Sequence, residues 1–177
     1  ALCMASCGLS SKEDAIQRLP SDQISVFTSS DKQLENAYNW AKKMALSYAH
    51  DNSDPVGYWY EAALPQREAF CMRDVSHQSV GAQILGLARH NKNMFTRFVE
   101  NISEEKDWCT YWEINRYNKP APADYTNDKE FWYNLNANFD VMQACLKMYQ
   151  WTGDAGYLTD PLFTNFYEKS VNEYVHR

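Results

Sequence analysis

An apolar helix begins at a charged pair in the segment FCMRDVSHQ, residues 70–78. Apolar and small side chains continue beyond this segment at helical spacing, which predicts a helix from about Asp74 to His90. The small residues imply close neighbours on more than one side of this helix. The charged pair is Arg73 and Asp74, and a guanidinium beside a carboxylate at the start of a helix can bind the hydroxyl groups of one sugar ring.

The segments on either side of this helix predict further helices. Residues 30–33 form a capping box before an apolar stripe, and Asp160 followed by Pro161 is a typical helix start. The expected helices cover about 31–50, 74–90, 94–102, 135–151 and 161–174. A short polar turn makes the second and third of them an antiparallel hairpin, and MFTRFVE (94–100) is similar to LFTNFYE (162–168). We therefore expect an all-α fold of antiparallel helical hairpins over 31–177, preceded by a tether at 1–30.

Two aromatic loops separate these helices. Residues 51–65 contain Tyr58, Trp59 and Tyr60, and the long stretch 107–133 contains eight aromatic residues, among them Trp112 and Trp132. Loops this long in a small domain are usually functional. Trp59, Trp112 and Trp132 are therefore candidate stacking platforms for sugar rings, with the alternative that each clamps its own loop onto the helices.

The composition narrows the classes of partner. The chain has 177 residues, 45% of them hydrophobic and 23% charged, which is ordinary for one globular domain. Its formal net charge of −6 and its lack of a basic cluster argue against a nucleic-acid partner.

The first residues resemble the end of a bacterial lipoprotein signal peptide. MASC (4–7) fits a lipobox, with Cys7 as the lipidated residue. This interpretation predicts a protein anchored in the membrane of the cell envelope, in the periplasm or at the outer surface. The alternative is a short tail with two incidental cysteines.

The other three cysteines, Cys71, Cys109 and Cys145, show no spacing typical of a metal site. We expect buried thiols, and the alternative is a single disulfide between two of them. We predict neither a metal nor a cofactor.

The chain resembles the six-hairpin, (α/α)6-barrel glycosidases of the glucoamylase-like group. The residues that carry the resemblance are Arg73 and Asp74 at a helix start, the long aromatic loop, and the turn YQWTGD (149–154). The resemblance covers about 31–177 and implies roughly the first half of such a toroid, so that we expect an N-terminal portion of a longer protein. It also implies that Arg73 and Asp74 hold the sugar in the subsite where the bond breaks.

Glycoside hydrolysis needs a carboxylic acid to protonate the leaving oxygen and a second carboxylate. The resemblance implies that the acid lies in the loop before the next inner helix. Glu130 is the first candidate because of its distance along the chain to the helix expected at 135–151. Glu113 is the second, because it too lies among aromatic residues that could desolvate its carboxyl group and raise its pKa. The partner base is expected outside these residues, which makes the fragment alone inactive.

Simpler interpretations stay open for these residues. Asp74 could only cap its helix, with Arg73 solvated, and His77 could be an ordinary hydrogen-bonded residue. Arg67 and Glu68 could line the pocket or form an exposed ion pair. The predicted function is a glycoside hydrolase acting on environmental oligosaccharides or polysaccharides; the alternative is a non-catalytic glycan-binding surface lipoprotein. A polysaccharide lyase or unsaturated-uronide hydrolase ranks last, because the chain is acidic and poor in histidine.

Overall fold

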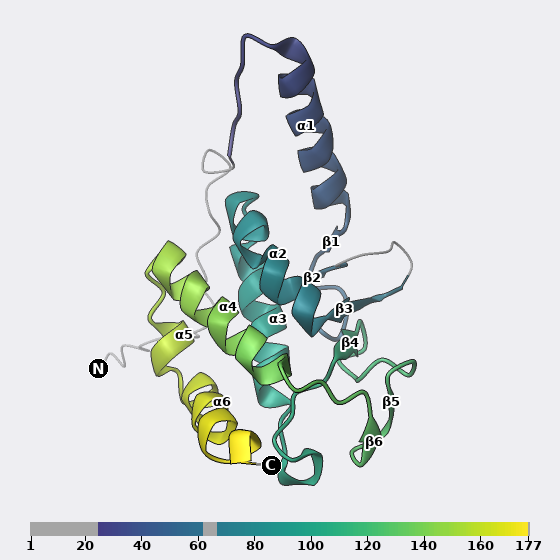
Figure 1. Cartoon of the computed structure of the whole chain (residues 1–177). Helices are drawn as coiled ribbons and strands as arrows, with labels where there is room; N and C mark the ends of the chain where they lie inside the picture. Colours follow the sequence, from purple (N-terminus) through teal and green to yellow (C-terminus); the bar gives the residue numbers. More distant parts are fainter. Residues whose placement is uncertain (1–24, 62–66, 177) are drawn as a thin grey trace, which may run out of the picture.

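The computed structural model of the chain describes residues 25–61 and 67–176 (Figure 1). Cys7 and its lipobox therefore lie outside the described residues. The helices are α1 (Lys32–Ser47), α2 (Met72–Ile84), α3 (Ala88–Glu100), α4 (Ala137–Thr152), α5 (Gly156–Thr159) and α6 (Pro161–Asn172), with the short 3-10 helices η3 (Glu104–Lys106) and η4 (Tyr174–His176).

The described residues also form three small antiparallel sheets of two strands each. They pair β1 (Ala49–His50) with β2 (Trp59–Tyr60), β3 (Ala69–Cys71) with β4 (Glu113–Asn115), and β5 (Tyr125–Asn127) with β6 (Glu130–Phe131). The prediction of an all-α fold forming about half of an (α/α)6 toroid was therefore wrong, because the chain has a mixed architecture of helices and small sheets. The reason is that the long loops satisfy their backbone N–H and C=O groups by pairing with one another. Strands of two or three residues carry no periodic signal that the sequence could reveal.

The core lies where α2 packs against α3 and α4, with α6 on the far side of α3 (Figure 1). Its largest fully buried side chains include four phenylalanines from the two similar segments, Phe95 and Phe98 of α3 and Phe163 and Phe166 of α6. Tyr157 of α5 connects the two segments, with its ring centroid 6.3 Å from that of Phe95 and 5.7 Å from that of Phe163. The repeat noticed in the sequence thus corresponds to two helices that share one apolar core.

The boundary between α2 and α3 differs from the prediction. The expected helix ran on to His90, whereas α2 ends at Ile84 and α3 already begins at Ala88. Gly86 has φ +85°, and its N–H donates to Gln83 O at 3.1 Å, so it terminates α2 in the manner of a left-handed cap. The predicted polar turn at 89–93 is the first part of α3.

The first aromatic loop is tied to the core by Trp59, whose side chain is fully buried. Its indole Nε1 donates to Asp54 Oδ2 at 2.8 Å, and its ring stacks on His50 with centroids 4.0 Å apart. Trp59 is therefore a core residue and does not offer a free face to a sugar, contrary to the predicted stacking role.

Helix α1 projects from the rest of the molecule, and Figure 1 shows it at the upper end of the view. Its N-cap Asp31 accepts hydrogen bonds from the backbone N–H groups of Gln33 and Leu34 at 2.9 and 3.3 Å. None of its residues is buried, and the large side chains of Leu34, Trp40 and Met44 are exposed. Within the described residues no helix has the length and apolar character needed to cross a bilayer.

Candidate functional site

The start of α2 is fixed by the pairing of β3 with β4. The register places Cys71 opposite Glu113, and the N–H of Met72 donates to Trp112 O at 2.8 Å. Cys71 is the N-cap residue and makes no side-chain capping hydrogen bond. Asp74 is therefore not the cap: it lies inside the first turn, where a carboxylate interacts favourably with the positive end of the helix dipole.

Arg73 lies over the aromatic loop. Its guanidinium carbon is 5.0 Å from the centroid of the Trp112 ring, and the Trp112 and Trp132 rings are 6.1 Å apart at an interplanar angle of 43°. Trp132 is 57% exposed and is held in place by its backbone N–H, which donates to Asp124 O at 2.7 Å. An exposed indole beside a guanidinium and a second indole offers both a stacking face and hydrogen-bond donors.

A second group of charges is centred on Glu113, which is paired with Cys71 in the β3–β4 sheet. Arg67 binds Glu113 in a bidentate manner, with Nε to Oε1 at 2.7 Å and Nη2 to Oε2 at 2.8 Å, and the same Nη2 is 3.6 Å from Asp124 Oδ2. The Glu113 side chain is 4% exposed and that of Arg67 is 45% exposed. One half-exposed guanidinium thus serves two carboxyl groups, one of which is almost wholly buried.

Burial raises the pKa of the Glu113 carboxyl group, and hydrogen bonding and charge repulsion from Asp124 raise it further. Arg67 acts in the opposite sense, since the pairing favours the ionised form. The upward effect prevails, because the Arg67 charge is partly screened by solvent whereas the Glu113 carboxyl group has lost its own hydration. A carboxyl group of raised pKa is the kind that can donate a proton at neutral pH.

Cys71 connects the two groups of charges. Burial raises the pKa of its thiol to about 11, and the carboxylates of Asp74 and Glu113 both act on it in the same direction. Asp74 lies in the first turn of α2 and Glu113 is paired with Cys71, so both carboxylates belong to the end of the β3–β4 sheet at which α2 begins. We call this set the α2 cluster: Arg67, Cys71, Arg73, Asp74, Trp112, Glu113, Asp124 and Trp132.

The two candidate general acids occupy different environments. Glu130 is exposed in β6, opposite Asn127, whereas Glu113 is buried within the α2 cluster. The order of preference taken from the sequence, Glu130 before Glu113, is therefore not supported by burial. Distance along the chain to α4 was a poor guide, because β4 brings Glu113 directly beside the start of α2.

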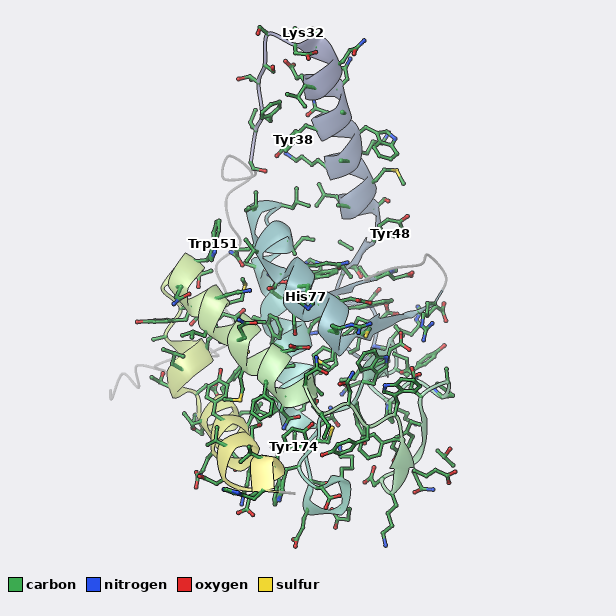
Figure 2. The ribbon with its side chains drawn as sticks, in the orientation of Figure 1. Lys32, Tyr38, Tyr48, His77, Trp151 and Tyr174 are labelled. Carbon is green, nitrogen blue, oxygen red and sulfur yellow. The ribbon has the colours of Figure 1, made fainter. Side chains whose placement is uncertain are left out.

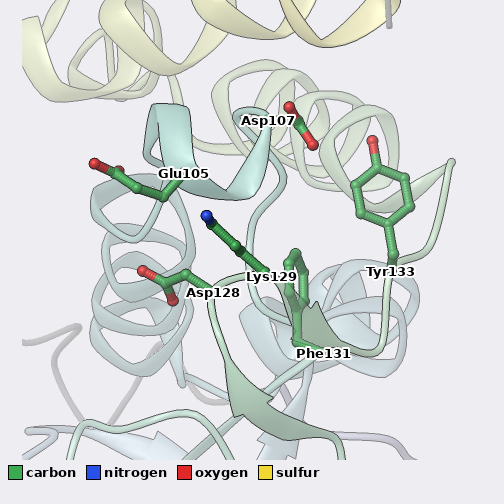
Figure 3. Close-up of a pocket in the computed structure, with 6 residues that line it drawn as sticks. All are labelled: Glu105, Asp107, Asp128, Lys129, Phe131 and Tyr133. Atoms are coloured by element: carbon green, nitrogen blue, oxygen red, sulfur yellow. The ribbon is translucent and has the colours of Figure 1, made fainter.

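A separate hollow of about 610 Å³ lies at the β5–β6 turn (Figure 3). Its wall contains three acidic side chains, one lysine and two aromatic rings. These belong to Glu105, Asp107 and Asp128, to Lys129, and to Phe131 and Tyr133. Glu130 is not part of this wall. The described residues contain no group of three histidine, cysteine, aspartate or glutamate side chains placed to hold a metal ion, so the acidic residues of this hollow do not form a metal centre.

One helical turn beyond Asp74, His77 and Gln78 enter the wall of a groove of about 510 Å³ between α1 and α2. Figure 2 shows His77 on α2 in the middle of the molecule, with Tyr48 near the end of α1 above it. This groove also contains Glu61, which the sequence did not mark as a site residue. Asp124 was missed as well, because nothing distinguishes it from any other carboxylate of the long loop.

The three cysteines of the described residues form no disulfide and are all buried: Cys71, Cys109 and Cys145. Burial raises the pKa of Cys145 to about 12, so this thiol, like that of Cys71, is held in its neutral form. None of the three is placed as a nucleophile.

Comparison of the chain with protein-family models, with curated proteins and with solved structures found no match. The function is therefore inferred from the residues of the site.

Proposed function

We propose that the α2 cluster binds a sugar ring and forms part of the active site of a glycoside hydrolase, as the resemblance to glucoamylase-like glycosidases implies. The observation that carries the proposal is the position of Arg73 over Trp112, whose ring lies beside that of the exposed Trp132, at the start of a helix whose first turn holds Asp74. Indole faces stack on the C–H faces of a sugar ring, while the guanidinium and the carboxylate bind its hydroxyl groups.

Glu113 is the proposed general acid. It would transfer its proton to the glycosidic oxygen as the bond to the anomeric carbon breaks, and the upward shift of its pKa favours the protonated form that a general acid needs. Asp124 is too close to act as its partner, because the two carboxyl groups of a glycosidase lie about 5 Å or more apart to accommodate the substrate or a water. Asp124 instead raises the pKa of Glu113, and the second carboxylate is expected from another part of the protein.

The test separates binding from hydrolysis. Trp132→Ala is expected to weaken the affinity for oligosaccharides at least tenfold, because it removes the exposed stacking face. The matched control is Trp151→Ala on α4, since Trp151 is also 57% exposed and lies outside the α2 cluster. Isothermal titration against a panel of neutral oligosaccharides measures both, and an equal response of the two variants would contradict the proposed site.

Hydrolysis is measured as sugar released by this chain and by any longer protein that contains it. Glu113→Gln is expected to lower the rate by about 10² to 10⁴, as is typical of the loss of a general acid, with oligosaccharide affinity unchanged. A rate that stays the same in Glu113→Gln contradicts the role of Glu113.

A non-catalytic glycan-binding module is the second candidate, and the bidentate pairing of Glu113 favours it. Both carboxylate oxygens of Glu113 already accept hydrogen bonds from Arg67. This geometry suits a structural ion pair at least as well as it suits a proton donor. This candidate predicts oligosaccharide binding that depends on Trp132 without any release of sugar.

A further inference from the structure

The groove between α1 and α2 contains a carboxylate that the rest of the molecule leaves incompletely bound. The Glu61 side chain is 8% exposed, and its Oε1 lies 3.5 Å from His50 Nε2. Its Oε2 is buried and has no hydrogen-bond partner among the described residues. A buried carboxylate normally has its oxygens bound, because the lost hydration is costly.

The backbone around Glu61 holds it firmly at this position. The N–H of Glu61 donates to Tyr48 O at 3.0 Å, directly beyond the pairing of Ala49 with Tyr60 in the β1–β2 sheet. The sheet thus places Glu61 between the C-terminal end of α1 and the body of the protein. Glu61 lines the groove, and because the terminal torsion of a glutamate is broad, its carboxylate can rotate toward a ligand there.

His50 does not satisfy the hydrogen-bonding capacity of the Glu61 carboxylate. A charge-assisted N–H···O contact is normally about 2.7–2.9 Å long, whereas the His50–Glu61 distance is 3.5 Å. The His50 ring is stacked on Trp59, and its backbone oxygen is bound by His90 Nε2 at 3.0 Å. Its position is therefore fixed by other contacts, and it leaves Oε2 without a donor.

The remaining wall of the groove is aromatic and apolar. Trp40, Met44 and Tyr48 of the α1 segment face Tyr60, His77 and the small residues of α2 across a volume of about 510 Å³. The Tyr60 hydroxyl donates to Asn91 Oδ1 at 2.9 Å, so that residue contributes chiefly its ring. Among the described residues that line the groove there is no lysine or arginine.

We propose that this groove binds a protonated amine, with Glu61 accepting hydrogen bonds from the ammonium group and the rings of Trp40 and Tyr48 enclosing the carbon frame. An ammonium group supplies three donors and a full positive charge, which is what a buried, partly unbound carboxylate lacks. Aromatic side chains around the charge add cation–π attraction. The amine belongs either to an amino sugar or to a simple organic amine, and the proposal is independent of the function assigned to the α2 cluster.

The experiment is a titration of the chain, followed by tryptophan fluorescence and calorimetry, with D-glucosamine, D-glucose and benzylamine. Glucose is the neutral counterpart of glucosamine, and benzylamine carries the ammonium group without the sugar. Glucosamine is expected to bind at least tenfold more tightly than glucose. Binding of benzylamine as well would identify the ammonium group as sufficient, and binding of glucosamine alone would identify an amino sugar.

Glu61→Gln is expected to reduce amine affinity at least tenfold, because it removes the charge and keeps the size. Glu168→Gln, at an exposed glutamate of α6, is the matched control and is expected to change nothing. Trp40→Ala, which alters a 67% exposed side chain, provides a second readout that does not depend on how Glu61→Gln folds. It is expected to weaken amine binding several-fold.

Three results would overturn the proposal: no binding of either amine, equal binding of glucose and glucosamine, or amine binding that neither Glu61→Gln nor Trp40→Ala weakens. Arg73→Ala serves to keep the two sites apart. It is expected to reduce oligosaccharide binding at the α2 cluster and to leave amine binding unchanged, so that failure of one proposal is visible without failure of the other.

Discussion

Helices α1 and α4 are both sixteen residues long, yet they are held in opposite ways. Helix α1 has a side-chain N-cap at Asp31 and an ion pair between Lys32 and Glu35, but it buries none of its residues. Helix α4 has no side-chain capping bond and buries six residues, among them Val141, Cys145 and Met148. The comparison teaches that local signals place a helix, whereas tertiary burial determines how firmly it is held.

The largest effect is expected from truncating a buried methionine of α4. Met148→Ala leaves a cavity beside α2 and α3 and should lower the free energy of unfolding by about 2–5 kcal/mol, since Met148 is fully buried. Met44→Ala, at a 37% exposed side chain of α1, is the matched control and should change it by no more than about 0.5 kcal/mol. Urea denaturation measures both, and similar losses in the two variants would contradict the comparison.

The next effect concerns the polar side chain inside α4. Asn138 is fully buried, and its amide binds Thr110 N at 3.0 Å, Trp108 O at 2.8 Å and Ser170 Oγ at 2.9 Å. Asn138→Ala leaves these groups without partners and should cost about 2–3 kcal/mol of unfolding free energy. Asn136→Ala, two residues earlier and exposed, is the control; a neutral result for Asn138→Ala in the same denaturation series would show that water replaces the amide.

A pH effect of about 1 kcal/mol is expected from Lys106, which is 3% exposed. Burial lowers its pKa from 10.5 to about 8, while its Nζ donates to Asn101 O and lies 3.7 Å from the Tyr111 ring centroid. The unfolded chain then binds more protons than the folded one between these two values, so stability should rise from pH 8 to pH 9. Lys106→Met should remove this rise in stability, and the control Lys32→Met, on α1, should retain it. Denaturation curves at several pH values measure both variants, and an unchanged dependence of stability on pH in Lys106→Met would contradict the assignment.

The smallest effect should come from the cap of α1. Asp31→Ala should cost roughly 0.5–1 kcal/mol, and because α1 buries nothing the loss should be confined to faster hydrogen exchange in that helix. Asp160→Ala removes the equivalent cap of α6, where Asp160 accepts from Leu162 N at 2.9 Å. Because α6 buries Phe163 and Phe166, the stability lost in Asp160→Ala should also appear as a lower free energy of global unfolding. If Asp31→Ala lowers the free energy of global unfolding equally, α1 belongs to the cooperative core and the comparison is contradicted.

The sequence predicted most helices because their ends carry local signals. The ranges 31–50, 135–151 and 161–174 agree closely with α1, α4 and α6, since Asp31, Gly153 and Pro161 mark their ends. The end of α2 was missed because Gly86 lies within an apolar pattern that continues into α3. The strands were missed because their pairing joins residues far apart in the chain, which no local pattern reports.

Residues of the candidate site could be predicted only where the residue type itself indicates a binding role. The charged pair Arg73 and Asp74 and the tryptophans of the long loop could be named from the sequence, but the choice among carboxylates could not. Burial distinguishes Glu113 from Glu130, and it arises from the β3–β4 register. For the same reason, the sequence did not single out Asp124 or Glu61, and it did not show that Trp59 is buried.

The pairing of Cys71 with Glu113 encloses α2 and α3 within one closed loop of chain. Closing a loop costs conformational entropy before its contacts form, so this pairing is expected to follow the assembly of the α2–α3 hairpin it encloses. Arg73 and Trp112 would then meet late in folding, after most of the helical structure is present. In a refolding experiment, helical circular dichroism should recover before the fluorescence change of Trp112 and Trp132, and a ligand of the α2 cluster should slow unfolding more than it speeds folding.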